Sequence, residues 1–306
     1  MRSDSSPFFS IIVPVYNRSA FVSTLIDSVL QQTYSSFELI IVNDGSTDDT
    51  EAVILRYTDT RLKYIRTENN ERGAARNKGA QLANGSYFNF FDSDDRMLPH
   101  HLATAWTFIN SRKFPPWFHT GYALVDEDGE MILEELGELT QAEKRLIVTN
   151  YLGCDSVFVE RSLFMQTQFN ADRILSSSED WELWLRLISR ERLLACQIIT
   201  VHMVQHTSRS LLTISPDRII ERDTYLLNSL LQDKAFCDKY FTWLGIFEAD
   251  RYTFFSLCLL LAKRRQEASN YLWKSLITSP RVLLRRRFWA CGKKLLMSSF
   301  SQSKFN

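Results

Sequence analysis

The chain has 306 residues, of which 45% are hydrophobic and 24% are charged. This length and composition are typical of a globular protein with a full hydrophobic core, and they exclude a disordered or fibrous chain. Basic and acidic residues are equal in number, 36 of each, which argues against a protein that binds nucleic acid through a general positive charge.

Strands and helices are predicted to alternate along the first hundred residues. Short β-branched or aromatic runs predict strands, and the segments between them carry a helical pattern. We expect strands at 10–16, 37–42, 62–66 and 87–91, and helices at 19–32, 48–57 and 74–83. Such a series predicts an open α/β sheet that is mainly parallel and is covered by helices.

The pattern becomes mixed from about Trp117. We expect strands at 118–125, around 155–160 and near 194–203, with a turn at 126–129 and a helix that begins at Glu179 or Asp180. After Pro216 the chain is predicted to be almost wholly helical. We therefore predict two domains, an α/β domain of residues 1–215 and a helical, basic C-terminal extension of residues 216–306.

Polar residues follow three of the predicted strands at the points where those strands end. Asn17 and Arg18 follow the first strand, Asp44 follows the second, and the acidic segment 92–95 follows the fourth. Ligands of open parallel sheets bind outside the carboxyl ends of the strands. The three groups are therefore predicted to converge on one edge of the sheet.

The segment Asp92-Ser-Asp94-Asp95 places three carboxylates within four residues. Their mutual repulsion favours a divalent cation, Mn²⁺ or Mg²⁺, and such an ion commonly completes its shell with substrate phosphates. A diphosphate ligand is thus indicated. The alternative is a solvated turn, because Asp and Ser are turn formers, and Asp44 could likewise do no more than fix the turn at 43–46.

Five segments of the chain resemble glycosyltransferase family 2, whose members have a GT-A fold. They are 11–18 (Ile-Ile-Val-Pro-Val-Tyr-Asn-Arg), 42–49, 72–79, 91–95 and 178–186, and they occur in the family's order over roughly residues 8–210. The resemblance implies a Rossmann-like GT-A domain. It also implies inverting transfer of a sugar from a nucleotide sugar, most commonly a uridine one, to a hydroxyl of a glycan, a lipid-linked or another acceptor.

The resemblance implies a role for each motif. The residues that would bind the nucleotide are Pro14, Val15, Tyr16, Asp44, Arg72 and Asp92. Arg76 is a second choice to Arg72. Asp94 would be the principal metal ligand, Asp92 would lie near the ribose or the metal, and Asp95 is the less certain of the three. His206, on a loop further along, could approach the metal or the diphosphate, although a lone histidine is more often structural.

Asp180 is implied to be the catalytic base. An inverting transfer needs one carboxylate to take the proton of the acceptor hydroxyl, while a metal ion stabilises the departing diphosphate. The alternative for Asp180 is a helix N-cap, because a helix is predicted to start here. Trp181 and Trp184 follow at helical spacing, which favours core packing, although an aromatic face at either position could stack on an acceptor sugar.

Residues 263–306 carry eleven Lys or Arg and one acid, Glu267. The mixture of Arg with Leu, Phe and Trp at 282–290 suits a helix on an anionic membrane surface, and the alternative is an amphipathic helix packed against a neighbour. The apolar stretch 252–262 is too short to span a bilayer and predicts a buried helix.

The N-terminal segment does not read as a signal peptide, and the five cysteines are widely spaced without a CxxC pair. These features predict reduced thiols and a cytoplasmic protein, at the inner face of the membrane if the basic tail binds lipid.

Two other functions fit the sequence less well. A non-catalytic scaffold that binds nucleotide sugars should have lost its carboxylates, whereas Asp92, Asp94 and Asp180 are all present. A sugar nucleotidyltransferase would need a Gly-rich, Arg-containing phosphate loop after the first strand, where Pro14-Val-Tyr-Asn17 stands instead.

Overall fold

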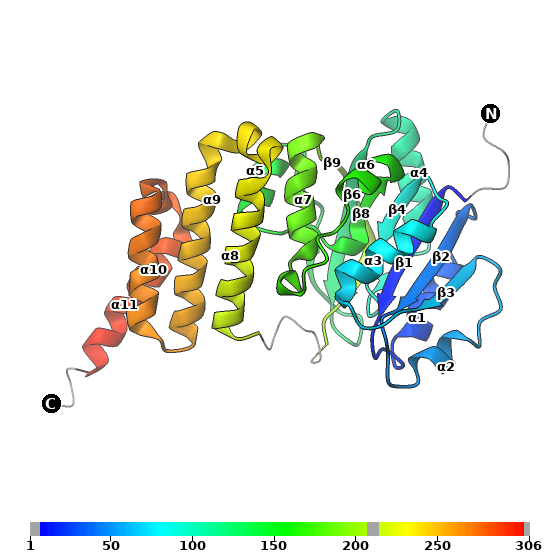
Figure 1. The fold of residues 1–306 in the computed structure, drawn as a ribbon, viewed down its shortest axis with the longest axis horizontal. Helices are drawn as coiled ribbons and strands as arrows, with labels where there is room; N and C mark the ends of the chain where they lie inside the picture. Colours follow the sequence, from blue (N-terminus) through cyan, green and yellow to red (C-terminus); the bar gives the residue numbers. More distant parts are fainter. Residues whose placement is uncertain (1–6, 207–213, 303–306) are drawn as a thin grey trace. The chain divides into compact units, whose positions relative to one another are not determined.

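A computed structural model describes residues 7–206 and 214–302 of the chain, and it describes side chains as far as residue 296. The chain divides into two compact units, Met1–Arg209 and Ser210–Asn306 (Figure 1). These are called unit 1 and unit 2 below. The functional division at residue 216 stays a prediction.

Unit 1 is built on one mixed sheet, with the strand order β3-β2-β1-β4-β8-β6-β9-β5 and β7 paired to β6. The strands are β1 (Phe9–Val15), β2 (Phe37–Asn43), β3 (Leu62–Arg66), β4 (Tyr87–Phe90), β5 (Arg96–Met97), β6 (Trp117–Val125), β7 (Met131–Glu135), β8 (Val157–Glu160) and β9 (Leu194–Val204). The first four strands are mutually parallel, and β8 joins β4 in antiparallel register. The predicted α/β sheet is confirmed.

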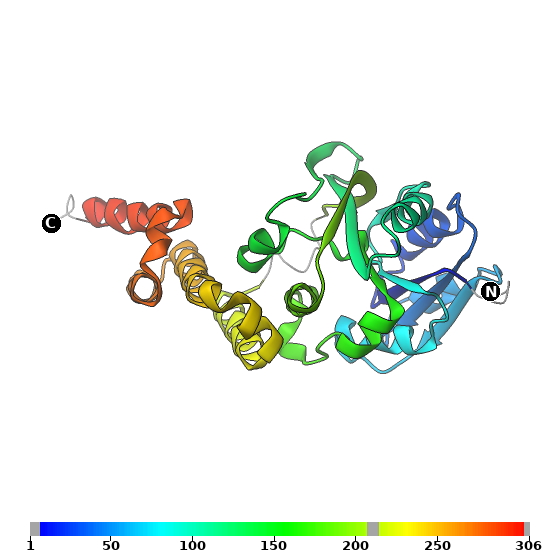
Figure 2. The ribbon, with the colours of Figure 1, turned by 90° about the horizontal axis from the view of Figure 1, so that it is seen from above.

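Helices cover both faces of this sheet (Figure 2). They are α1 (Val22–Leu30), α2 (Thr50–Ile54), α3 (Glu71–Leu82), α4 (His101–Ser111), α5 (Ala142–Val148), α6 (Arg161–Thr167) and α7 (Glu179–Arg190), with short 3₁₀ turns η1 (Cys154–Ser156) and η2 (Arg173–Leu175). Because both faces are covered, every residue of β1 and β2 is buried. Apolar residues of α1 and α4 pack against one face in a single core.

On the opposite face, α3 approaches the sheet closely at Gly79. A Cβ atom at this position would lie 2.5 Å from Cγ2 of Ile12 and 3.1 Å from Cγ2 of Val42. Only a residue without a side chain allows this approach. The glycine at the end of the third motif therefore sets how closely the helix, with its arginines, lies to β1 and β2.

The predicted elements differ from the observed ones mainly at their ends. Helix α1 begins at Val22 rather than at residue 19, because the residues directly after β1 form a loop. Helix α2 is shorter than predicted. The predicted strand at 155–160 begins only at Val157, because η1 occupies the preceding residues. Helices α4, α5 and α6 and strands β5 and β7 were not predicted.

Unit 2 is helical over its described residues. It contains α8 (Pro216–Gln232), α9 (Lys234–Leu261), α10 (Arg265–Thr278), a 3₁₀ turn η4 (Pro280–Leu284) and α11 (Arg286–Gln302). Helix α8 starts as its sequence suggests, because the Ser215 side chain accepts a hydrogen bond from the Arg218 amide and Pro216 occupies the first turn.

The apolar stretch at 252–262 forms the end of α9 and is largely buried, which confirms the predicted buried helix. Among the described residues no helix is both long and apolar enough to cross a bilayer. All five cysteines are free thiols, as predicted.

Candidate functional site

The loops that follow β1 and β2 are joined by hydrogen bonds at the carboxyl edge of the sheet. The Asp44 amide donates to the Val15 carbonyl at 2.8 Å, and the Asn17 amide donates to Ser46 Oγ at 3.0 Å. Asn17 Oδ1 in turn accepts from the Thr47 amide at 2.8 Å. The backbone at this edge is therefore held in place before any ligand binds.

The predicted nucleotide-binding residues of β1 and β2 lie together at this edge, with different exposures. Pro14 and Val15 are buried, so their side chains belong to the core and only their backbone could face a ligand. The Tyr16 side chain is 46% exposed. Asp44 is buried, and its Oδ1 accepts from the Asn70 amide at 2.9 Å. Asp44 thus has a structural contact whether or not it also binds nucleotide.

Asp94 lies beside His206 and Arg18. Its Oδ2 atom is 2.9 Å from His206 Nε2 and 3.7 Å from Arg18 Nη2. His206 is buried and stacks on Phe21, with ring centroids 5.0 Å apart. Asp94 and His206 line a cavity of about 270 Å³ that is also bordered by α1, β5 and Glu127. The structure therefore brings together Asp94 and His206, two of the three residues that the sequence named as candidate metal ligands, from positions 112 residues apart. The third, Asp92, contacts Arg76.

A second acidic cluster consists of Asp92, Asp95 and Asp155, whose carboxylate oxygens lie within 4.8 Å of one another. Asp155 is fully buried, and its Oδ1 accepts a hydrogen bond from the Asp92 amide. Its Oδ2 has no hydrogen-bond partner among the described residues. Asp95 accepts from the Val204 amide at 2.8 Å. Burial, together with the negative charges of Asp95 and Asp92, raises the pKa of Asp155 well above its usual range.

The sequence did not identify Asp155 as a site residue. It lies in η1, a segment without a motif, and the only signal in the sequence is an acid directly before an apolar strand. Its proximity to Asp92 depends on the antiparallel pairing of β8 with β4, in which Asn89 faces Phe158.

Arg76 connects the acidic segment to helix α7. Its Nη2 lies 2.6 Å from Asp92 Oδ1, and its Nη1 lies 2.7 Å from Glu179 Oε1. The Arg76 side chain is only 1% exposed, so this is a buried bridge. Arg72, which the sequence favoured over Arg76, has its Nε 3.6 Å from Glu179 and is 32% exposed. Arg76 therefore contacts Asp92 directly, and Arg72 stays a candidate contact to a ligand.

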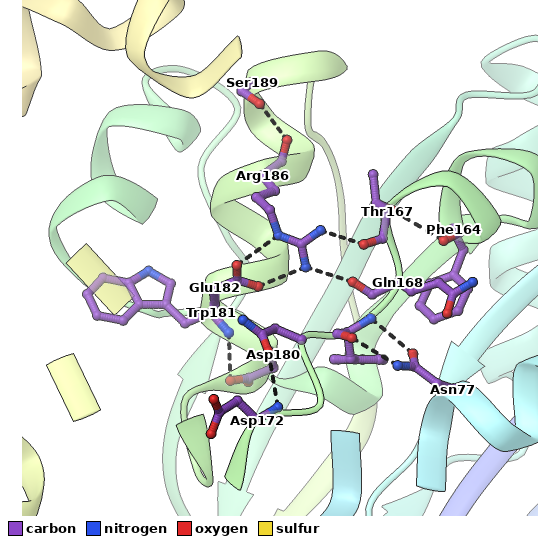
Figure 3. Close-up of polar contacts among 12 residues, drawn as sticks. Asn77, Phe164, Thr167, Gln168, Asp172, Asp180, Trp181, Glu182, Arg186 and Ser189 are labelled. Carbon is purple, nitrogen blue, oxygen red and sulfur yellow. Dashed lines mark hydrogen bonds and ion pairs between the residues drawn. The ribbon is translucent and has the colours of Figure 1, made fainter. Parts of the chain in front are cut away.

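Asp180 lies in the first turn of α7, as predicted, but it is not the N-cap, which is Ser178. Its Oδ1 accepts from the Trp181 amide at 2.7 Å (Figure 3), and its Oδ2 accepts from Asn150 Nδ2 at 3.2 Å. Burial, and then the adjacent charge of Glu179, raise the pKa of Asp180 to about 6. Such a carboxylate can accept a proton near neutral pH.

Arg186 fixes the helix that carries Asp180 (Figure 3). Its guanidinium forms two bonds to Glu182, at 2.9 and 2.8 Å, and also donates to the carbonyls of Thr167 and Gln168 at the end of α6. Glu182 is itself buried. The start of α7 is thus held by a charged network as well as by apolar packing, and the sequence did not single out this network.

Both tryptophans of α7 belong to the core. Trp184 is fully buried and stacks on Trp117, with ring centroids 6.1 Å apart. Trp181 is 4% exposed, and its Nε1 donates to the Leu146 carbonyl at 2.8 Å. The alternative that either ring stacks on an acceptor sugar is therefore wrong, because neither ring is accessible.

The helix-covered, mixed α/β sheet, with acidic residues at the carboxyl ends of its first strands, has the architecture of the GT-A fold. The chain belongs to glycosyltransferase family 2. The sequence model described as Glycosyl transferase family 2 matches residues 10–116.

Three relatives illustrate this membership. A Rickettsia bellii (strain RML369-C) glycosyltransferase of uncharacterised function is 34% identical over 60% of this chain and 27% of its own length. TuaG of Bacillus subtilis (strain 168), whose name places it in teichuronic acid biosynthesis, is 32% identical over 60% of this chain and 73% of its own length. WfgD of Escherichia coli, named as a UDP-Glc:alpha-D-GlcNAc-diphosphoundecaprenol beta-1,3-glucosyltransferase, is 25% identical over 73% of this chain and 87% of its own length.

The matches span only 27–59% of the length of the five Rickettsia relatives.

Solved structures share the fold. Residues 1–349 of S. aureus TarS in complex with UDP-GlcNAc superpose with a TM-score of 0.70 at 20% identity, over 97% of this chain and 92% of that chain. The mannosyltransferase PcManGT of Pyrobaculum calidifontis, in complex with GDP-Man and Mn²⁺, superposes with a TM-score of 0.57 at 16% identity, over 97% of this chain and 87% of that chain.

Proposed function

We propose that the protein is an inverting, metal-dependent glycosyltransferase that transfers a sugar from a UDP-sugar to an acceptor hydroxyl in polysaccharide or glycan synthesis. The observation that carries this proposal is the bridge of Arg76 between Asp92 and Glu179. It joins the carboxylates at the strand ends to the helix turn that holds Asp180, so that donor-binding and proton-accepting groups form one site. The names of WfgD and of the TarS complex, which refer to UDP-Glc and UDP-GlcNAc, support a uridine donor.

The residues present fit a divalent cation. Asp94 and His206 offer an oxygen and a nitrogen 2.9 Å apart at the edge of a cavity, and Asp155 in the adjacent acidic cluster has an unpaired, buried oxygen among the described residues. We assign Asp94, with Asp92 and His206, to hold Mn²⁺ or Mg²⁺. When bound, such an ion would neutralise charge on the diphosphate leaving group. The Mn²⁺ in PcManGT supports this assignment.

The nucleotide would bind along the edge formed by β1 and β2. The exposed ring of Tyr16 can stack on a planar base, and the backbone of Pro14 and Val15 borders the same edge. Asp44 uses Oδ1 for the Asn70 amide, whereas its Oδ2 makes no hydrogen bond to the described residues. That second oxygen can accept from a base or ribose donor.

Asp180 would act as the base in a single displacement. The acceptor oxygen forms its bond to the anomeric carbon while the bond from that carbon to the diphosphate oxygen breaks, and the acceptor proton passes to the Asp180 carboxylate. A pKa of about 6 leaves this carboxylate ionised at neutral pH and more basic than an ordinary aspartate. One displacement inverts the configuration at the anomeric carbon.

The relatives' names suggest a polysaccharide or a lipid-linked sugar as acceptor. A nucleotide-sugar donor and five free thiols support the predicted cytoplasmic location.

Transfer from a panel of nucleotide sugars, with Mn²⁺, Mg²⁺ or EDTA, tests the proposal. We expect turnover of a UDP-sugar that EDTA abolishes, loss of turnover in Asp94→Ala and Asp180→Asn, and an inverted anomer in the product by NMR. The matched control is Asp128→Asn, an exposed acid in the turn between β6 and β7, which should transfer normally. Retention of configuration, or full activity of Asp180→Asn, would contradict the mechanism. UDP-sugar binding without any turnover would favour the non-catalytic scaffold.

A further inference from the structure

The turn η4 and helix α11 carry exposed apolar side chains that sugar transfer does not use. Leu284 is 85% exposed, Trp289 is 60% exposed and Leu296 is 66% exposed. Neighbouring Val282 and Phe288 instead pack into the core of unit 2. The segment is therefore packed onto unit 2. Because Val282 and Phe288 point into the core, Leu284, Trp289 and Leu296 point outward.

The indole of Trp289 presents an apolar surface to solvent. Its only polar atom, Nε1, donates to the Leu283 carbonyl at 2.8 Å, so its hydrogen bond is made within the chain. This bond also places the ring beside the Leu283–Leu284 pair. Two exposed leucines and an indole thus form one apolar projection.

Positive charge surrounds this projection. Residues 268–306 contain eight Lys or Arg and no acid, although Lys304 lies outside the described residues. Arg281, Arg286 and Lys293 are exposed, whereas Arg287 turns inward and pairs with buried Asp250 at 2.9 Å. On α11, Trp289, Lys293 and Leu296 follow at spacings of four and three residues, which puts them on one face of the helix.

We propose that this basic–apolar face, made of Leu283, Leu284, Trp289 and Leu296 with Arg281, Arg286 and Lys293, docks the protein on an anionic lipid bilayer. Leucine and tryptophan side chains enter the boundary between headgroups and acyl chains, while arginine and lysine bind anionic headgroups. A second copy of the chain fits this face poorly, because two acid-free basic surfaces would repel each other. The binding is interfacial and requires no spanning helix.

Flotation of the full chain with lipid vesicles tests the proposal without reference to sugar transfer. We expect the protein to float with vesicles that contain phosphatidylglycerol, not with pure phosphatidylcholine vesicles, and to float less at high salt. The double variant Leu284→Ser/Trp289→Ser should bind about tenfold more weakly, and Arg286→Glu/Lys293→Glu should lose the preference for anionic lipid. The matched control is Leu231→Ser, which removes an apolar side chain of 46% exposure from α8 and should bind normally.

Each other outcome overturns the proposal. Absence of binding to anionic vesicles, undiminished binding of Leu284→Ser/Trp289→Ser, or an equal loss in Leu231→Ser would each do so. A dimer in light scattering that Leu284→Ser/Trp289→Ser dissociates, without vesicle binding by the parent, would assign the face to a second copy instead. Circular dichroism of each variant shows that a loss of binding does not come from unfolding. Because vesicle binding needs no turnover, its failure leaves the proposed transfer reaction untouched.

Discussion

At the scale of single residues, Asp180 connects geometry to a measurable pH dependence. A general base works in its deprotonated form, and burial with the neighbouring Glu179 raises the pKa of Asp180 to about 6. We therefore expect kcat to rise with pH through about 6 and to level off above it. Asp180→Asn should lower kcat by about 10²–10⁴ on the plateau above pH 6 and should lack the rise through pH 6. Initial rates of both proteins over a pH series measure this dependence. If kcat of the parent is the same below and above pH 6, the prediction is contradicted.

The raised pKa of Asp180 also predicts how stable the variant Asp180→Asn should be. A folded-state pKa above the unfolded value means that the contribution of Asp180 to stability is fully present below its unfolded pKa and is lost as pH rises through about 6. At neutral pH the ionised carboxylate therefore disfavours the folded state, and an amide removes that effect. Asp180→Asn should melt at or above the temperature of the parent at neutral pH. A clear decrease in Tm would show that Asp180 acts mainly as a structural group of the helix start.

Asp155 offers a second test at the residue scale. Its Oδ1 accepts the Asp92 amide, so Asp155→Ala should remove this hydrogen bond, at a cost of about 1–3 kcal/mol. Asp155→Asn keeps an acceptor oxygen at the same position. We expect UDP binding in the presence of Mn²⁺, measured by calorimetry, to weaken more in Asp155→Ala than in Asp155→Asn. Equal losses in the two variants would contradict a role through this hydrogen bond.

At the scale of elements, the network of Arg186 holds α7 against the end of α6. Arg186→Ala would leave Glu182 buried and without its cation, and removal of one member of a buried pair costs roughly 3 kcal/mol. Tm and kcat should both fall, because the start of α7 carries Asp180. The control is Arg192→Ala, an exposed arginine just after the same helix. Thermal melting and transfer rates measure both variants, and an unchanged Tm in Arg186→Ala would show that apolar packing alone holds the helix.

The elements that could be predicted from sequence are those whose pattern is local. Strands β1 and β2 are buried on both faces and mostly apolar, so most of their residues give the same signal. Helix ends were predicted less well, since they depend on loop contacts such as the bond from the Asn17 amide to Ser46. Helices α4, α5 and α6 were missed.

The site residues also divide into those that the sequence could identify and those that it could not. Asp44 and Asp94 follow strands of the parallel sheet, so their position at one edge could be expected from topology, whereas Asp180 was assigned through the family resemblance. Asp155 and Arg186 could not be found like this, because their partners lie far along the chain or are backbone carbonyls. Arg76 was ranked below Arg72, since a sequence alone does not show which arginine of a helix faces the sheet.

At the scale of the whole molecule, the net charge of zero conceals two opposite halves. Residues 1–209 contain twenty Lys or Arg and twenty-eight Asp or Glu, so this part is acidic. Residues 210–306 contain sixteen Lys or Arg and eight Asp or Glu, so this part is basic. A diphosphate donor is an anion, so unit 1 repels it at long range. We therefore propose that local cations, namely Arg18, Arg72 and the proposed metal ion, would provide the attraction. This explains why we expect EDTA to weaken nucleotide binding as well as turnover.

The two compact units lead to a calorimetric prediction. A ligand that binds only folded unit 1 stabilises it by RT ln(1 + [L]/Kd), about 2.7 kcal/mol at one hundred times Kd. Differential scanning calorimetry should show that UDP with Mn²⁺ raises the temperature of one unfolding transition and leaves the other in place. Asp94→Ala, which removes the principal predicted metal ligand, should abolish this increase, and Asp128→Asn should retain it. If both transitions instead move together by the same amount, the units unfold as one cooperative body, and ligand bound to unit 1 then stabilises the basic helices of unit 2 as well.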